Sequence, residues 1–209
     1  MKNDAKNAAG HPSNQQRMFI EKPIIPDFAF GVLRRKYFDH TNYAVDFIHA
    51  KLHPVAAQVE TAHSCTRWEP TAHSYDVLLP AEVPDVFSDP RVLVQFFEDS
   101  ATQQQKDLVV MLKLTAPADS TLHAFRENVR AYSRLEFVEK RSLATVMALH
   151  VPGFSGTKTP ERPHIHVVVL PRTISKLGFL GYCDIANSES QAPLVEAWKR
   201  SSNPKAPRD

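Results

Sequence analysis

The chain has 209 residues, of which 43% are hydrophobic and 23% charged, an ordinary composition for a globular protein with a buried core. Its two cysteines, Cys65 and Cys183, lie far apart and form no CxxC pair, which argues against a disulfide framework and against a cysteine-based zinc ribbon. The formal net charge of +2 permits a nucleic-acid partner without arguing for one.

Polar segments at both ends predict tails around one folded domain. Residues 1–17 contain no apolar run of the kind found in signal peptides. No stretch approaches the roughly 18 apolar residues of a membrane span. We therefore expect a cytoplasmic protein without a membrane partner, with a disordered tail over 1–17, a domain over 18–200 and a flexible tail over 201–209.

The first half of the chain predicts mixed secondary structure. Residues 17–25 favour a short strand closed by a proline, and residues 28–50 lean towards a helix. Residues 55–73 are loop-like, and residues 75–79 favour a second strand. Pro90 sits where the first turn of a helix tolerates proline, and an apolar pattern of helical period follows it through residue 109.

The second half adds two helices and three strands. Residues 109–115 alternate partly and predict a strand. A helix follows, capped by Ser120 or Asp119, with one apolar face made of four residues: Leu122, Phe125, Val129 and Tyr132. Strands are then expected to end at His150 and to begin at His164, and a short helix closes the domain. Without strict βαβ alternation, this order favours an α/β sandwich with a mainly antiparallel central sheet flanked by helices.

Three histidines form the most informative pattern. In PHIHVVVLPR, His164 and His166 are two residues apart in a predicted strand, so both point to one face of the sheet. His150 ends the preceding predicted strand. If the two strands pair antiparallel, the three imidazoles converge on one divalent cation such as Mn²⁺, Mg²⁺ or Zn²⁺. Three ligands that leave open positions are typical of catalytic sites, because structural zinc sites usually close with four.

With this pattern and its setting, the chain resembles the MobA/MobL family of plasmid mobilisation relaxases, which belong to the HUH endonucleases. The similarity covers roughly residues 70–200. Its blocks are HSYDVLLP with the helix and strand after it, the helix ADSTLHAFRENVRAY, the strand SLATVMALH, the block ERPHIHVVVLPR, and the later LGFLGYCDIANSES. The resemblance implies a relaxase-like fold over residues 18–200 and places His150, His164 and His166 on the family's metal-ligand positions.

The resemblance also implies a chemistry. In relaxases a tyrosine on an N-terminal helix attacks a phosphodiester of single-stranded DNA at the transfer origin, leaving a 5′-phosphotyrosine and a free 3′-hydroxyl. Tyr43 and Tyr37 lie near the expected place, and Tyr43 is favoured because an apolar stretch follows it. Neither stands in a full copy of the family's motif, and the direct counterpart of the family's tyrosine could instead be Phe47 or Asp46. Other relaxosome proteins would be further partners.

Three functions therefore stay open. The first is a metal-dependent, DNA-nicking and strand-transfer relaxase. The second is a relaxase-derived DNA-binding or regulatory module without a catalytic tyrosine. The third is a hydrolase of small phosphoesters that uses water as its nucleophile. Arg172, just beyond the histidine-bearing strand, is either a phosphate contact or an exposed charge, and nothing in the sequence makes His49, His53 or His123 a ligand.

Overall fold

The computed structural model describes residues 22–54, 68–102, 104–153 and 161–202. The predicted tail over 1–17 lies outside these residues. Of the predicted tail over 201–209, Ser201 and Ser202 belong to the last helix, and the rest lies outside the described residues. The elements in chain order are β1 (Lys22–Ile25), β2 (Phe28–Arg34), β3 (Lys36–Tyr37), β4 (His40–Thr41), α1 (Ala44–Leu52), β5 (Ser74–Leu78), the 3₁₀-helix η2 (Asp85–Ser88), α2 (Pro90–Asp99), β6 (Asp107–Thr115), α3 (Leu122–Ser133), the π-helical turn η3 (Arg134–Glu139), β7 (Leu143–His150), β8 (His164–Ser175), β9 (Gly178–Tyr182) and α4 (Gln191–Ser202).

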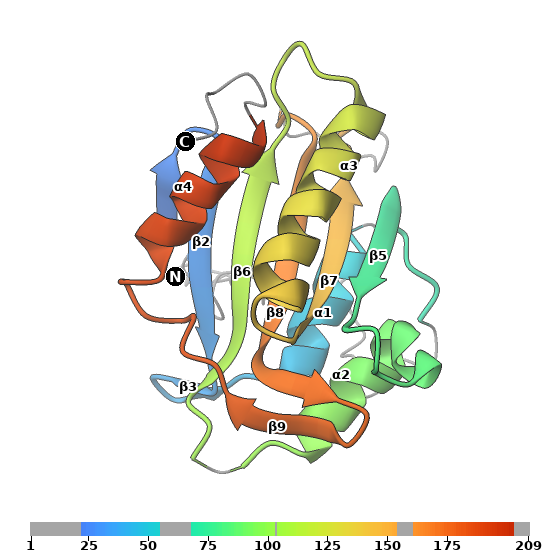
Figure 1. Ribbon diagram of the computed structural model, residues 1–209, viewed down its shortest axis with the longest axis vertical. Coiled ribbons are helices and arrows are strands. Elements are labelled where there is room, and N and C mark those ends of the chain that lie inside the picture. The colour runs from blue at the N-terminus through green and yellow to red at the C-terminus, as the bar shows by residue number, and fades with distance from the viewer. Residues whose placement is uncertain (1–21, 55–67, 103, 154–160, 203–209) are drawn as a thin grey trace, which may run out of the picture.

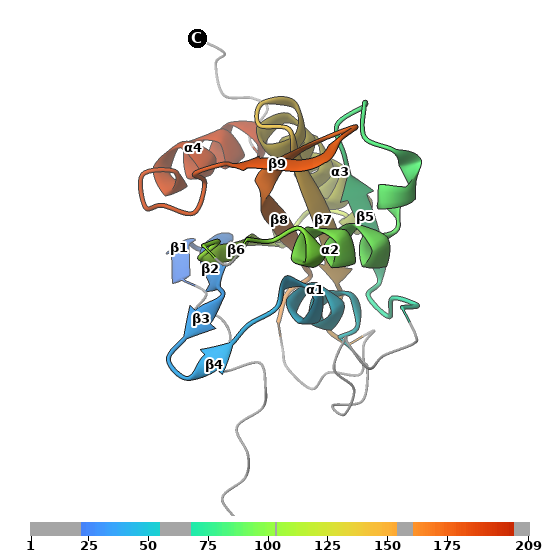
Figure 2. The same ribbon diagram turned by 90° about the horizontal axis from the view of Figure 1, so that it is seen from below.

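One antiparallel sheet organises the domain. Its strands follow the order β1-β2-β6-β8-β7-β5, and β9 pairs with the end of β8. Helices α3 and α4 cover one face, while α1 and α2 pack on the other (Figures 1 and 2). The prediction of an α/β sandwich with a mainly antiparallel sheet is confirmed. Among the described helices, none has the length and apolar character that crossing a bilayer requires.

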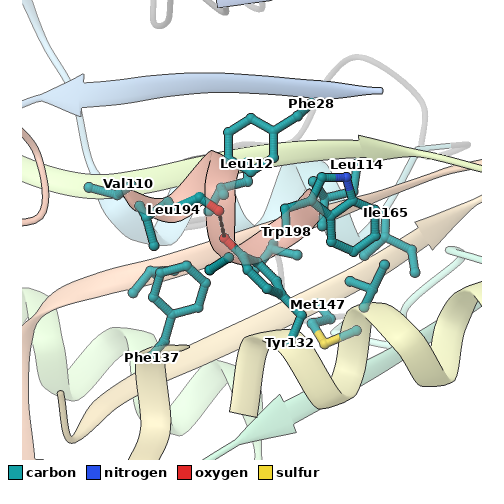
Figure 3. Packing of buried hydrophobic residues seen from close by; sticks show 14 of the residues in the cluster. Phe28, Val110, Leu112, Leu114, Tyr132, Phe137, Met147, Ile165, Leu194 and Trp198 are labelled. Atoms are coloured by element: carbon teal, nitrogen blue, oxygen red, sulfur yellow. Dashed lines mark hydrogen bonds between the residues drawn. The ribbon is translucent and has the colours of Figure 1, made fainter. Parts of the chain in front are cut away.

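Alternation along the central strands divides the interior into two cores. Ile165, Val167 and Val169 of β8 face α3 and α4, where Tyr132 and Trp198 also pack (Figure 3). The Tyr132 hydroxyl donates a hydrogen bond to the Leu194 carbonyl oxygen, 3.0 Å away, and so ties α3 to α4. Val168 and Leu170 of β8 instead face the core beneath α1 and α2. Because the side-chain period of a strand is two, His164 and His166 lie on that second face.

Capping fixes where two of the helices begin. Asp89 precedes Pro90, and its carboxylate accepts hydrogen bonds from the backbone N–H groups of Arg91 and Val92 at the start of α2. Helix α2 ends at Asp99, ten residues before the end of its predicted apolar pattern. The cap of α3 is Thr121, not Ser120 or Asp119, because the Thr121 hydroxyl accepts from the Ala124 backbone N–H. Each such cap stabilises a helix by about 1 kcal/mol.

The prediction of a helix over residues 28–50 is wrong for its first part. Residues 28–34 form β2, which pairs with β1 on one side and β6 on the other. Most of this strand is buried on both faces, so it is apolar without alternation and gives no two-residue period. The helix of this region begins only at Ala44. Strands are present within the predicted segments 75–79 and 109–115, and β1 occupies the described part, Lys22–Ile25, of the strand predicted over 17–25, whose other residues lie outside the described ones. The strand β9 had no prediction.

Candidate metal centre

The three predicted histidines meet at the end of two neighbouring strands. In the antiparallel register of β7 and β8, His150 lies directly opposite His164, and Ala148 lies opposite His166. The three ring centroids are 5.3 Å (His150–His164), 4.6 Å (His150–His166) and 4.9 Å (His164–His166) apart. One ligand atom from each ring can be chosen so that all three lie within 4.8 Å of one another.

This spacing suits a shared cation. Two nitrogens bound tetrahedrally at about 2.1 Å from one zinc ion are about 3.4 Å apart. The rings would therefore close by about 1.4 Å at most, which small side-chain rotations supply. His164 and His166 are each 5% exposed, and the Nδ1 atom of His166 is buried without a hydrogen-bond partner among the described residues. A buried imidazole nitrogen without a partner is costly, and a bound ion would relieve that cost.

Hydrogen bonds fix which ring nitrogen His150 and His164 can each offer to a cation. His150 Nε2 donates to the Lys51 carbonyl oxygen at 2.7 Å, which leaves Nδ1 with its lone pair. His164 Nδ1 donates to the Arg162 carbonyl oxygen at 3.0 Å, which leaves Nε2. Metal-ligating histidines commonly donate their second ring N–H to a backbone carbonyl in this way, and the bond holds the ring in its ligating orientation.

The pKa values of the rings favour the neutral, ligating form. Burial lowers the pKa of His164 to about 4, and it is also the main cause that lowers the pKa of His150 and His166. The positive charge of Lys113 lowers all three further, and that of Lys51 lowers those of His150 and His166. Neutral imidazoles at neutral pH are the state that binds a cation without first releasing protons.

Two lysines and one glutamate surround the rings. Lys113 on β6 lies opposite His166 on β8, so both side chains leave the same face of the sheet. The Lys113 ammonium is 3.5 Å from the Glu161 carboxylate, which is 3.8 Å from His164 Nδ1. The Lys51 ammonium lies over the Phe47 ring, 5.3 Å from its centroid. Positive side chains beside a cation site attract an anionic ligand such as a phosphate.

Lys51, Lys113 and Glu161 had no place in the sequence prediction. A signal existed for Lys113, the one charged residue in the otherwise apolar run VVMLKLT. Its position opposite His166 follows from the β6–β8 register, which the sequence does not encode visibly. Lys51 contributes through its backbone carbonyl as well as its charge, and a carbonyl carries no residue-type signal.

The two tyrosines stand apart from the histidines. Tyr43 is the residue before the first turn of α1, while Lys51, which contacts His150, lies in the last turn. Eight residues of helix separate them by about 12 Å along the axis. Tyr43 instead lines a cavity together with Arg35 and Lys36, and the Arg35 guanidinium lies 5.8 Å from the centre of its ring. Tyr37 lies in β3, which comes before α1 in the chain, and is farther from α1 in sequence than Tyr43 is.

Arg172 has a structural role at the other end of β8. Its Nε and Nη2 donate to the carbonyl oxygens of Leu180 and Phe179, and its Nη1 donates to Ser100. Eight residues separate it from His164, a span of about 27 Å in a strand. The arginine therefore fastens β9 to the end of α2. His49 and His53 are not surface residues: their rings stack, with centroids 4.0 Å apart, beside Trp68.

Comparisons with known proteins support the fold. No family model matches the chain, and no curated protein does. A solved structure described as "Molecular Basis of Vancomycin Resistance Transfer in Staphylococcus aureus" is similar, with 16% sequence identity and a TM-score of 0.54, over 65% of this chain and 70% of that one. At this identity the similarity concerns the fold alone. The chain shares the fold of that structure over the matched part, and its three clustered histidines are consistent with a metal centre.

Proposed function

We propose that this protein is a metal-dependent relaxase that nicks single-stranded DNA and transfers the strand through a phosphotyrosine, in plasmid mobilisation. The observation that carries the proposal is the convergence of His150, His164 and His166 on one face of the sheet, with every ring neutral at physiological pH. The relaxase-like fold and the resemblance to the MobA/MobL family support the choice of DNA as substrate.

Each group around the centre has a role in phosphoryl transfer. The three imidazoles would hold Mn²⁺, Mg²⁺ or Zn²⁺, and imidazole ligands suit zinc better than magnesium or manganese. A bound divalent cation offsets charge on the phosphoryl oxygens and orients the scissile phosphate. Lys113 and Lys51 add positive charge on the side from which a phosphate would approach, while Glu161 holds the Lys113 ammonium near the rings.

Tyr43, or else Tyr37, is the proposed nucleophile. The phenolic oxygen would form a bond to phosphorus as the bond from phosphorus to the 3′-oxygen breaks, and the phenol would give up its proton. The products are a 5′-phosphotyrosine and a free 3′-hydroxyl. Since Tyr43 lies about one helix length from Lys51, this attack requires the start of α1 and the DNA to approach each other in the complex.

Formation of a covalent adduct tests the proposal. The protein is incubated with Mn²⁺ and single-stranded oligonucleotides tiled across the DNA that flanks its coding sequence, then resolved under denaturing conditions. A protein–DNA band is expected for the wild type and for the control His123→Ala. His123 lies on α3 and is not part of the histidine cluster. No band is expected for His166→Ala or for the double variant Tyr43→Phe, Tyr37→Phe. An adduct that survives the double variant contradicts tyrosine chemistry at these positions.

The placement of Tyr43 favours a second candidate, a relaxase-derived DNA-binding or regulatory module. Tyr43 and Tyr37 both lie away from the histidines, and α1 itself, Ala44–Leu52, contains no tyrosine. Such a module would bind DNA with an affinity that falls as salt rises, because phosphate contacts release counterions. It would give no covalent band under denaturing conditions, while a native binding assay with the same oligonucleotides would show salt-dependent binding.

A further inference from the structure

An exposed aromatic pair forms the tip of the hairpin β3–β4. All residues from Lys36 to Thr41 are exposed, and the Phe38 ring is 87% exposed. Tyr37 meets Phe38 edge to face, with ring centroids 4.8 Å apart and planes at 83°. The hairpin projects from the sheet on the side of α1 (Figure 2). A large apolar ring so fully in water is unfavourable unless it has a ligand to contact.

The backbone at this tip is unusual as well. Phe38 has a φ of +52°, the left-handed region that asparagine and glycine normally occupy in tight hairpins. For an aromatic residue this conformation costs on the order of 1–2 kcal/mol. The ring gains no burial in return, because it is exposed. An unfavourable conformation that presents a ring to solvent is better explained by contact with a ligand than by folding.

The base of the hairpin is firmly held. Asn42 is buried, and its side-chain amide donates to the Arg34 carbonyl oxygen at 2.7 Å, while its backbone N–H donates to that of Arg35. The Arg35 guanidinium pairs with the Glu98 carboxylate at 2.8 Å, and this carboxylate, only 8% exposed, also accepts from the Ala44 backbone N–H. The hairpin is therefore an exposed tip on a fixed base, which limits the conformational entropy lost when the tip binds a ligand.

Charge on the hairpin indicates the kind of ligand. Arg34 and Lys36 come just before the aromatic pair in the chain, and the Arg34 side chain is 70% exposed. Asp107 lies 3.5 Å from Arg34, a weak surface pair, and Asp39 is the one acidic residue within the hairpin. Aromatic rings beside cations suit single-stranded nucleic acid, because bases stack on the rings while phosphates contact the charges.

The end of β2 that leads into the hairpin and the histidine His166 lie beside opposite ends of β6. Arg34 pairs with Asp107 at one end of β6, and His166 lies opposite Lys113 near the other end. Six residues of strand separate these positions by about 20 Å. A single DNA strand of a few nucleotides can span this distance. A cavity of about 590 Å³, lined by Lys36 and Tyr43 among others, adjoins the hairpin.

We propose that Phe38, assisted by Tyr37 and Lys36, forms a stacking platform for a base of single-stranded DNA, a few nucleotides from the phosphate at the histidine centre. This inference deepens the proposed function, because it assigns where the bound strand is held away from the reacting phosphate. It requires no metal and no nucleophile, so it stands or falls separately from the nicking chemistry.

Fluorescence anisotropy with labelled oligothymidylate, in the presence of a chelator, tests the platform on the full chain. Loss of one stacked base costs about 1–3 kcal/mol, so Phe38→Ala should weaken binding roughly 5- to 150-fold. Phe38→Trp should restore it, since tryptophan keeps the stacking face. Leu177→Ala is the matched control, because Leu177 is an apolar side chain 79% exposed at the tip of the other hairpin, between β8 and β9.

The platform is contradicted if Phe38→Ala binds oligothymidylate as tightly as Leu177→Ala. It is equally contradicted if the wild type does not bind this probe. A third contradicting result is that Phe38→Ala loses binding to anionic phospholipid vesicles and keeps binding to DNA, because the tip would then bind a lipid surface. Photocrosslinking of a bromodeoxyuridine oligonucleotide should mark the peptide that contains Tyr37 and Phe38.

Discussion

His150 donates a hydrogen bond from Nε2 to the backbone carbonyl oxygen of Lys51, 2.7 Å away, and so joins the last turn of α1 to the histidine cluster. This bond crosses from helix to sheet and links residues 99 positions apart in sequence. It orients the His150 ring and brings the positive charge of Lys51 towards His166. The position of α1 and the geometry of the histidine cluster are therefore coupled.

Removal of one imidazole should abolish tight metal binding. His166→Ala leaves two ligands, on the neighbouring strands β7 and β8, and an apolar gap where the third ring was buried. Affinity for Mn²⁺ or Zn²⁺ should therefore fall by at least about 100-fold. Loss of a partner that merely orients a ligand already costs 10- to 100-fold. Isothermal titration of the purified protein measures the affinity, with His123→Ala as the matched control on α3. Equal affinities of the two variants would contradict the three-histidine centre.

The metal-free protein should lose stability in mild acid. The unfolded His164 has a pKa near 6.5, and burial lowers the folded pKa to about 4. Between these values the unfolded chain binds a proton that the folded chain does not, so the free energy of unfolding falls as pH falls through this window. The loss from His164 reaches about 3 kcal/mol by pH 4. Thermal unfolding in chelator from pH 7.5 to 4.5 measures it.

Carboxylates also titrate near the lower end of that range, so a matched variant is needed. His164→Asn removes the titrating ring and keeps a polar side chain of similar length. Its melting temperature should decline less between pH 6.5 and 4.5 than that of the wild type. Parallel declines would mean that the buried ring does not set the acid sensitivity.

The histidine cluster was predictable because its information is local. The two-residue spacing of His164 and His166 fixes their shared face, and the Gly- and Pro-containing connection from β7 to β8 carries no helical pattern, which favours antiparallel pairing with the strand of His150. The register that places Lys113 opposite His166 depends on two strands 50 residues apart. Contacts set by such register, like the bond from His150 to Lys51, follow from the packed fold and leave no local pattern.

The mistaken first part of the helix predicted over 28–50 has a related cause. Phe28, Phe30 and Leu33 of β2 are buried against different cores, so apolar residues occupy both faces of the strand. A strand buried on both sides loses the alternation that identifies strands in a sequence.

The role of Arg172 likewise depends on the packed fold. The sequence left it as either a phosphate contact or an exposed charge. Its four hydrogen bonds to Leu180, Phe179 and Ser100 join segments whose proximity the sequence does not show.

Glu98→Gln should destabilise the domain where α1 meets the hairpin. The Glu98 carboxylate pairs with Arg35 and accepts from the first backbone N–H of α1, at a site where both side chains are largely buried. Glutamine keeps the size but leaves Arg35 without its counter-charge, so the free energy of unfolding should fall by about 2–4 kcal/mol. Urea denaturation measures the change. Glu196→Gln is the control, because its pair with Lys199 is exposed on α4, and a comparable loss there would contradict the role of Glu98.

Gly178→Ala should destabilise the turn that carries β9, for two separable reasons. Gly178 has a φ of +95°, which an L side chain rarely adopts, and an added Cβ would lie 2.9 Å from the Phe96 ring on α2. Gly153 has nearly the same φ, +93°, with no atom within 4 Å of an added Cβ. Gly153→Ala therefore measures backbone strain alone, about 1–2 kcal/mol, and any excess in Gly178→Ala measures the clash. Chemical denaturation of both variants should show Gly178→Ala to be the less stable. Equal losses would mean that the Phe96 ring moves aside freely, and that β9 does not rely on close packing against α2.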